Sequence, residues 1–214
     1  MFCYTSLMDI ASTVFVLIII IFSAIIHEVM HGYVADSLGD PTARYAGRLT
    51  LNPLSHLDMF GSIFLPLILA IGGSPIFFGY AKPVPYNPYN LRPGRFSEAF
   101  VAGAGPLSNL VLALLGALII RSNVFAGTND IVFLVVVVNV MLCLFNLIPI
   151  PPLDGSKVLE ALLPRPLRNG YAAWRHRMDH NPFLGMALII LIIVLLGGTW
   201  SNFLFSVASK IAGI

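Results

Sequence analysis

The sequence feature that most constrains this chain is an apolar stretch that ends in a cluster of ionisable residues. The stretch runs almost unbroken from Val14 to Ile26 and leads directly into His27-Glu28-Val29-Met30-His31. An ionisable side chain at membrane depth costs about 2.5–3.5 kcal/mol on insertion scales, so three of them within five residues need a common partner. A divalent cation supplies such a partner.

The spacing within this cluster is typical of a metal site on a helix. His27 and His31 are four residues apart, so both imidazoles lie on one helical face at metal-binding distance. Glu28 occupies an adjacent position, from which it can reach a water molecule at the metal without ligating the metal. Two neutral imidazoles and one carboxylate form a typical catalytic zinc set. The alternative, polar residues satisfied inside a helix bundle, is disfavoured by the membrane context.

The third ligand must come from another part of the chain. Asp9 lies at the wrong end of the first apolar stretch, and Asp130 lies in a predicted outer loop. Asp58 and Glu98 each open a predicted helix, where the helix dipole already explains an acidic residue. Asp154 follows a proline-broken span end, and we expect irregular backbone to direct it into the protein interior. Position and orientation therefore favour Asp154, with Asp58 as the main rival.

The composition requires a bilayer as solvent. Apolar residues make up 57% of the 214 residues and charged ones only 10%, against about 25% charged in an ordinary globular domain. The sequence predicts an all-α polytopic membrane protein, a single integral membrane domain over residues 1–214. About five membrane-spanning helices are expected, at residues 8–33, 59–71, 97–120, 131–148 and 183–205.

Two further elements are expected between the spans. Prolines and glycines after the second span predict a re-entrant extended segment at 72–90, shielded by protein. Residues 44–51 alternate: Tyr45, Leu49 and Leu51 fall on one side and Arg44 and Arg48 on the other. This period of two predicts short strands or a small β-hairpin at the membrane surface.

The distribution of basic residues predicts the orientation. Lys and Arg concentrate in segments 35–58, 80–96 and 156–180, whereas loop 121–130 holds one arginine. Placing the basic segments in the cytoplasm puts the N-terminus outside and the metal site near the cytoplasmic face. The basic stretch 165–180 is expected to touch anionic lipid, and His56 is interpreted as an interfacial residue. The net charge of +2 is too small to suggest nucleic acid as a partner.

With these residues identified, the chain resembles the site-2 protease family of intramembrane zinc metalloproteases over nearly its whole length. The 27–31 cluster looks like the first metal motif of the family. The run Asn146-Leu147-Ile148-Pro149-Ile150-Pro151-Pro152-Leu153-Asp154-Gly155 looks like its second motif, in which the aspartate is the third ligand. Gly105-Pro106-Leu107-Ser108-Asn109 is similar to its Gly-x-x-x-Asn element.

Segments 39–53 and 79–85 resemble a compact prokaryotic branch of the family, and we see no room for the PDZ or CBS domains of larger relatives. The resemblance implies one zinc ion per chain, held by His27, His31 and Asp154, with Glu28 as general base. It implies a prokaryotic cell-membrane enzyme whose partners are transmembrane protein substrates and the lipid bilayer.

Several polar residues have two interpretations. Asn146 either donates to the oxyanion or caps the carbonyls freed at a broken span end. Asn109 is expected to bond between helices rather than to touch substrate. The predicted strand with Arg44, Arg48 and Leu49 either pairs with an unwound substrate peptide or plugs the bundle, and the first is favoured. The role of segment 82–86 is left open.

Three rival functions use the same residues. A metal transporter would place ligands along a path, but the spans hold few other acids. A catalytically inactive scaffold that binds membrane helices is disfavoured because His27, Glu28, His31 and Asp154 are all present. A membrane-associated protease that cuts soluble peptides remains compatible with the motif. A protease acting within the bilayer leads, since the cluster lies at the end of a spanning segment.

Overall fold

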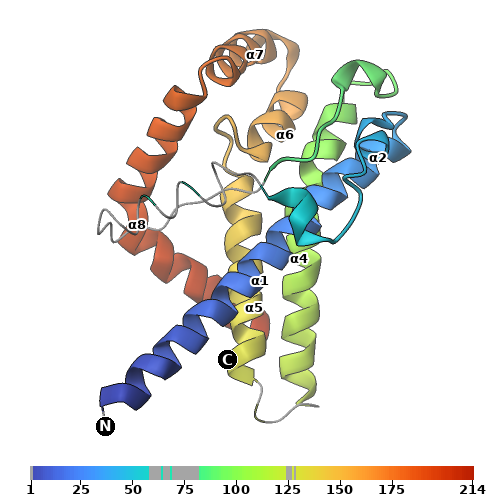
Figure 1. Cartoon of the computed structure of the whole chain (residues 1–214). Helices are drawn as coiled ribbons and strands as arrows, with labels where there is room; N and C mark the ends of the chain where they lie inside the picture. Colours follow the sequence, from blue (N-terminus) through green and yellow to red (C-terminus); the bar gives the residue numbers. More distant parts are fainter. Residues whose placement is uncertain (1, 58–63, 65–67, 69–81, 124–126, 128) are drawn as a thin grey trace. The chain divides into compact units, whose positions relative to one another are not determined.

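The computed structural model describes residues 2–57, 64, 68, 82–123, 127 and 129–214. The chain divides into two compact units, Met1–Asn90 and Leu91–Ile214. The described residues form helices and contain no strand (Figure 1). The predicted all-α class is therefore confirmed for them. Apart from Phe64 and Ile68, the predicted second span (59–71) lies outside the described residues, as does most of the re-entrant segment (72–81).

The first unit is organised around one long helix, α1 (Phe2–Ser37). Its apolar run gives the helix its length, and Gly39, with φ of +106°, takes up the left-handed conformation that ends many helices. Pro41 then prevents any continuation. Further along, the described residues of this unit include the short helices α2 (Thr42–Tyr45), η1 (Pro53–His56) and η3 (Pro88–Asn90).

The predicted strand or hairpin over residues 44–51 is wrong. Arg44 and Tyr45 belong to α2, and Arg48 N–H bonds back to the Ala43 carbonyl at 3.0 Å. Between them Gly47 adopts a φ of +63°, which reverses the chain. A local turn closed by its own backbone bonds therefore replaces the extended pairing that the alternation suggested.

The second unit holds five helices, α4 (Ser97–Ser122), α5 (Asn129–Asn146), α6 (Asp154–Leu162), α7 (Arg165–Asp179) and α8 (Pro182–Ala212). Helices α4 and α5 run side by side, and α8 packs against both (Figure 1). Small residues let these backbones approach closely: a Cβ on Gly116 would lie 2.9 Å from Val136 Cγ2. The buried cluster between the three helices consists of Ala113, Ala117, Ile120, Val136, Val140, Leu204, Ala208 and Ala212.

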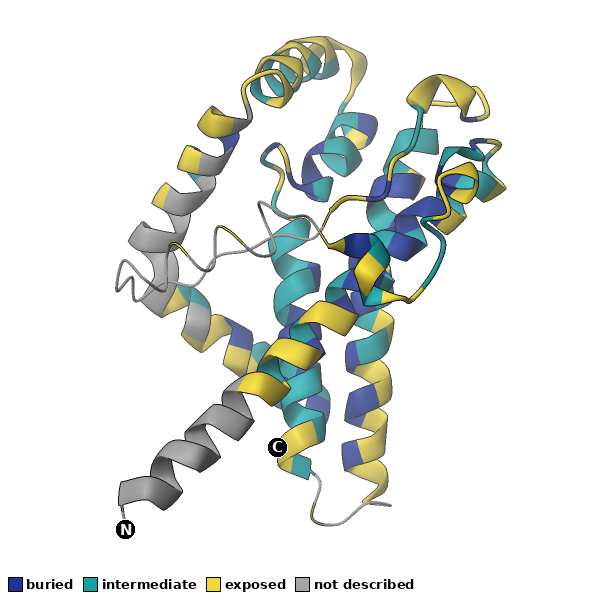
Figure 2. Ribbon diagram, viewed as in Figure 1, coloured by how far each residue is buried: buried dark blue, intermediate teal, exposed yellow. Residues whose placement is uncertain are grey.

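Among the residues that the structure describes, three helices are long and apolar enough to cross a membrane: Val14–Ser37 within α1, α4, and α5. They overlap the predicted spans 8–33, 97–120 and 131–148. Leu107, Leu114 and Leu118 of α4 are exposed apolar residues, as a lipid-facing surface requires. Figure 2 shows exposed positions along this helix. Residues of the predicted fifth span are helical in α8. The protein is thus an integral membrane protein with three candidate spans.

Candidate active site

The two histidines of the 27–31 cluster are buried and adjacent on α1. The residues His27 and His31 are only 6% and 8% exposed. Their ring centroids lie 4.7 Å apart with the planes nearly perpendicular, at 86°. One helical turn separates them, so the backbone of α1 alone brings the two imidazoles together.

Glu28 is oriented by a backbone group from the far end of the first unit. Its Oε2 accepts a hydrogen bond from the Val84 N–H at 2.9 Å. One carboxylate oxygen is therefore held by a backbone donor, and Oε1 remains available as a second acceptor. Sequence reasoning placed Glu28 in the site but gave no indication of this donor.

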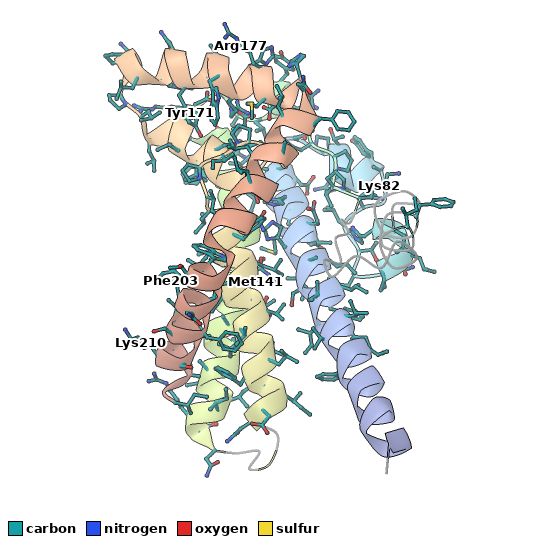
Figure 3. The ribbon with its side chains drawn as sticks, turned by 90° about the vertical axis from the view of Figure 1, so that its left-hand side faces the viewer. Lys82, Met141, Tyr171, Arg177, Phe203 and Lys210 are labelled. Atoms are coloured by element: carbon teal, nitrogen blue, oxygen red, sulfur yellow. The ribbon has the colours of Figure 1, made fainter. Side chains whose placement is uncertain are left out.

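The segment that carries Val84 is itself fastened at several points. The Lys82 N–H donates to the His56 carbonyl at 2.9 Å. Arg48 donates through Nη2 to the carbonyls of Lys82 and Pro83, at 2.8 and 3.3 Å, and through Nη1 to the Ser55 carbonyl. These contacts hold the extended segment 82–87 (Lys82 is labelled in Figure 3) against the turn that follows α2.

His56 takes part in this arrangement. It is only 2% exposed, and its Nε2 lies 2.8 Å from the Thr50 carbonyl. Its position at the membrane interface stays a prediction. His56 closes the 50–56 turn, whose carbonyl at position 56 receives the Lys82 N–H.

Asp40 anchors the other end of the segment. It is fully buried and accepts hydrogen bonds from Thr42, from the Asn87 N–H at 2.6 Å and from Asn90 Nδ2 at 2.9 Å. Burial by itself would raise the pKa of this carboxyl, but the hydrogen bonds outweigh burial and lower the pKa below its ordinary value. Asp40 was predicted only as part of a turn, and its carboxylate ties residues 87–90 to the end of α1.

Asp154 is the first residue of α6 in the second unit, with Leu153 as the preceding cap. A position at the start of a predicted helix explained Asp58 and Glu98, whereas Asp154 was expected to lie in irregular backbone. That expectation is wrong, because Asp154 also lies in a first helical turn, where the helix dipole favours an acidic residue. Of the two reasons for predicting Asp154 as the third ligand, only its position after the end of a predicted span remains.

The backbone around Asp154 is packed without room for a side chain at the next position. A Cβ on Gly155 would lie 2.1 Å from the Leu147 carbonyl oxygen and 2.7 Å from that of Ile148. A Cβ on Gly185 in α8 would lie 2.8 Å from the Pro151 carbonyl oxygen. The loop 147–153 is therefore enclosed by α6 and α8, and this enclosure fixes where α6 begins.

Tyr171 on α7 also holds this loop. Its hydroxyl donates to the Pro149 carbonyl at 2.9 Å. Burial is the main cause that raises the pKa of Tyr171 to about 12. Figure 3 shows Tyr171 and Arg177 projecting from different sides of α7. The tyrosine therefore faces inward to the loop, whereas Arg177 is exposed.

A network of ions fastens α7 to its neighbours. Arg175 bonds Glu160 on α6 at 2.6 Å and lies 3.7 Å from Glu98 on α4 and 3.3 Å from Asp179. Burial would lower the pKa of Arg175, but the carboxylates raise it above its ordinary value. These ion pairs fasten α7, the helix that carries Tyr171, to α6 and α4.

The two asparagines of the predicted motifs both make helix contacts. Asn146 Nδ2, at the end of α5, donates to the Leu142 carbonyl at 2.9 Å. Asn109 is fully buried in α4, and its Nδ2 donates to Asn139 Oδ1 on α5 at 2.9 Å. The Asn109 contact is of the kind expected for a residue that bonds between helices. The Asn146 contact is of the kind expected for a residue that caps a span end.

The residues predicted to bind substrate lie in the first unit with contacts of their own. Arg44 is 63% exposed and pairs with Asp36. Leu49 packs towards α1, since a Cβ on Gly32 would lie 2.6 Å from Leu49 Cδ2. Arg48 binds the backbone carbonyls given above. The structure therefore joins Arg48 and Leu49 to the surroundings of the 27–31 cluster and leaves Arg44 on the surface.

The donor set of the predicted ligands fits zinc. The three predicted ligands, His27, His31 and Asp154, offer two imidazole nitrogens and one carboxylate oxygen, which are donor types that hold metal ions. Zinc takes these ligand types and in catalytic sites has three protein ligands. Both imidazoles are buried, as a site shielded from bulk water requires.

Comparison with known proteins identifies a peptidase family and relatives named as zinc metalloproteases. The family described as Peptidase family M50 matches residues 119–177. The protein named "Putative zinc metalloprotease YwhC" from Bacillus subtilis (strain 168) is 40% identical over 164 residues, which cover 72% of this chain and 71% of that protein.

Two mycobacterial proteins are also similar. The "Putative zinc metalloprotease Rip2" of Mycolicibacterium smegmatis is 36% identical over 157 residues, or 69% of this chain and 57% of that protein. The protein of the same name from Mycobacterium tuberculosis (strain ATCC 25618 / H37Rv) is 29% identical over 205 residues, or 91% of this chain and 72% of that protein. No solved structure matches the chain. By its motifs, its membrane helices and these relatives, the chain belongs to peptidase family M50, the site-2 protease family of zinc metalloproteases.

Proposed function

We propose that this protein hydrolyses peptide bonds in or near the transmembrane segments of membrane proteins. The observation that carries the proposal is the buried pair of histidines on a helix long and apolar enough to span a bilayer, with a carboxylate between them held by a backbone donor. A site at the end of a spanning segment favours substrates that share the membrane over soluble peptides.

We propose His27, His31 and Asp154 as the ligands of one zinc ion per chain. The donor set supports this assignment, and so does the family to which the chain belongs. When bound, zinc supplies Lewis-acid chemistry that polarises the scissile carbonyl and acidifies water. The protein contributes the fixed spacing of the two imidazoles on α1 and the placement of Asp154 at the start of α6.

Glu28 is the general base in this proposal. Its Oε1 takes the proton of the attacking water while the Val84 N–H holds Oε2. The same carboxyl then passes the proton to the leaving amine, so that the group returns to its initial state. Glu28 lies next to His27 in sequence, and so α1 positions the base together with two of the ligands.

Asn146 is proposed as the donor to the oxyanion. A primary amide carries two N–H donors, and only one is needed for the bond to the Leu142 carbonyl. The second is available to a developing negative charge. Replacing one oxyanion donor typically lowers kcat by about 10²–10³-fold. We expect a loss of that size for Asn146→Ala, with bound zinc unchanged; a loss below about threefold would leave Asn146 as a helix cap alone.

Substrate contact is proposed for the turn with Arg44, Arg48 and Leu49. Since these residues form a turn rather than a strand, contact would involve the exposed Arg44 side chain and the backbone beyond Gly47. A transmembrane helix hides its carbonyls in its own hydrogen bonds and must unwind before attack. The proposed orientation, with the site towards the cytoplasmic face and the N-terminus outside, follows from the basic segments 35–58, 80–96 and 156–180.

The test measures bound metal and cleavage in parallel on purified wild type, Glu28→Ala and Asp154→Ala, with a panel of single-span test substrates. We expect wild type to hold one zinc ion and to cut. Glu28→Ala should keep the metal without cutting, and Asp154→Ala should lose both.

Each other outcome points elsewhere. Cleavage by Glu28→Ala at the wild-type rate would refute the mechanism. Normal metal binding by Asp154→Ala would move the third ligand to Asp58. Metal without cleavage by any form would favour a transporter or an inactive scaffold. Cleavage of soluble peptides alone would favour a membrane-associated protease.

A further inference from the structure

Val84 contacts Glu28 through a backbone group, not a side chain. Its N–H donates to Glu28 Oε2 at 2.9 Å across 56 positions of sequence. A donor on a fixed backbone has no rotamer of its own, so it restricts the carboxylate more than a mobile side chain would. The contact can therefore hold Glu28 in one orientation.

Three of the four backbone N–H donors in segment 82–87 are used within the chain. The N–H groups of Lys82, Val84 and Asn87 bond to the His56 carbonyl, to Glu28 and to Asp40. Pro83 and Pro85 have no N–H to offer. A substrate strand added to an edge needs a row of available donors, and this segment does not provide one.

The acceptors of the segment are also engaged near Val84. Arg48 Nη2 binds the carbonyls of Lys82 and Pro83. The two prolines restrict φ on both sides of Val84. The segment is therefore held by its own chain at three places, which are Arg48, His56 and Asp40.

Close packing against α1 completes the arrangement. A Cβ on Gly32 would lie 2.8 Å from Val84 Cγ1, so the segment approaches α1 so closely that a side chain at this position would require Val84 to move. Gly32 is one turn beyond Glu28 on the same helix, and this approach brings the Val84 N–H within reach of the carboxylate.

We propose that Val84 is a positioning residue for Glu28, and that segment 82–87 is a fixed brace for the general base rather than an edge that pairs with substrate. The proposal rests on the proposed function of Glu28. It assigns a role to a segment for which the sequence left the alternatives open.

The experiment compares Val84→Pro, which removes the N–H, with Val84→Ala, which keeps it and shortens the side chain. The full chain is purified, and kcat, KM, bound zinc and the thermal midpoint are measured. We expect Val84→Pro to lower kcat by about 10–100-fold, the usual effect of removing a partner that orients a metal-site group. KM and zinc content should stay within about twofold of wild type, and Val84→Ala should retain most of the kcat.

A readout independent of activity is the thermodynamic coupling between the two positions. Val84→Pro should lower the thermal midpoint in the wild-type background and lower it less in a Glu28→Ala background, because the donor then has no acceptor. If Val84→Pro does not fold, Pro83→Gly with Pro85→Gly loosens the brace but keeps the N–H. That variant should lower kcat less, again without a change in KM.

Several results would contradict the positioning role of Val84. A change in KM alone would indicate substrate pairing, and an equal loss of kcat in Val84→Ala would indicate side-chain packing. Additive changes in thermal midpoint when Val84→Pro is combined with Glu28→Ala would show that the two positions are not coupled. A wild-type kcat in both Val84→Pro and the double glycine variant would also contradict this role. The Glu28→Ala enzyme separates the two proposals: if it cuts at the wild-type rate, the general-base assignment fails whatever Val84 does.

Discussion

The surroundings of the 27–31 cluster and those of Asp154 are built in different ways. His27, Glu28 and His31 lie inside a continuous helix of 36 residues, so helix geometry alone sets the distances between them. Asp154 begins a helix of nine residues after a proline-rich loop, so its position depends on contacts made by α7 and α8. In the first region, one helix sets the distances between the site residues. In the second region, contacts with neighbouring helices set the position of Asp154.

The close-packed glycines show the same difference. Gly32 faces side-chain atoms of Leu49, Val84 and Ala43, and those of Leu49 and Val84 can rotate. Gly155 faces the backbone carbonyls of Leu147 and Ile148, which cannot. A change near the histidines can therefore be accommodated by side-chain movement, whereas a change near Asp154 must displace the main chain.

The largest loss of stability is expected when an added side chain at Gly155 disturbs the main-chain packing around Asp154. Gly155→Ala would place Cβ 2.1 Å from a backbone oxygen, and we expect a loss of more than about 3 kcal/mol or failure to fold. Gly32→Ala should cost less, about 1–3 kcal/mol. The thermal midpoints of the two variants measure this difference in stability.

The matched control for these two substitutions is Gly103→Ala in α4, where an added Cβ meets nothing within 4 Å. Because alanine favours helix over glycine by about 1 kcal/mol, this variant should be neutral or slightly stabilising. If Gly155→Ala is as stable as Gly103→Ala, the second region is not held by its main-chain packing.

A smaller loss of stability is expected when Asp40, which anchors segment 82–87 in the first region, is replaced. Asp40→Asn replaces an acceptor of several hydrogen bonds by an amide with donors of its own. We expect a loss of about 1–3 kcal/mol, the usual cost of leaving buried donors unpaired. Since segment 82–87 depends on this anchor, kcat should fall as well. An unchanged midpoint with a lowered kcat would mean that the anchor serves positioning alone.

The same residue predicts a pH dependence. The pKa of folded Asp40 lies below the ordinary 3.8. Its stabilisation is therefore complete above that value and is lost as the pH falls through the lower pKa of the folded state. Thermal midpoints measured between pH 7 and pH 3 should decrease more for wild type than for Asp40→Asn at the acid end. Parallel decreases in the two proteins would contradict this.

Tyr171→Phe sharpens the comparison with a milder change in the second region. Loss of the bond to the Pro149 carbonyl should cost about 0.5–1.5 kcal/mol. A protein of this size loses roughly 2–4 °C of thermal midpoint per kcal/mol. Bound zinc should fall with the midpoint, because the loop leads to Asp154. A wild-type midpoint and zinc content would show that α6 and α8 hold the loop without α7.

The smallest effect on stability is expected at Arg44. Its ion pair with Asp36 is solvent-exposed on the arginine side, and such pairs contribute about 0–1 kcal/mol. Arg44→Ala should therefore leave the thermal midpoint nearly unchanged. If the side chain contacts substrate as proposed, KM should rise while kcat stays the same. An unchanged KM would remove Arg44 from the substrate-binding residues.

Local patterns were sufficient for the helices that span and for the histidine pair. A long apolar run predicts a membrane helix because the bilayer sets its length, and α1, α4 and α5 overlap the predicted spans 8–33, 97–120 and 131–148. The spacing of His27 and His31 predicts a shared face because the helix repeat does not depend on distant residues.

Local sequence patterns could not predict the contacts between distant parts of the sequence. The Val84 donor to Glu28 joins positions 56 apart, and the Asn87 donor to Asp40 joins positions 47 apart. Backbone amides carry no residue signature, so no spacing rule indicates them. The alternation over 44–51 predicted a strand, yet Gly47 and local bonds produced a turn.

By itself the sequence thus determined the all-α membrane class, the metal motif and the family, because each depends on residue type and short-range spacing. Only the tertiary structure decided how Glu28 is held, what Asp40 and Tyr171 fasten, and that Asp154 begins a helix. Those features depend on which backbone groups meet after the chain has folded. That outcome follows from packing and hydrogen-bond satisfaction over the whole of each unit.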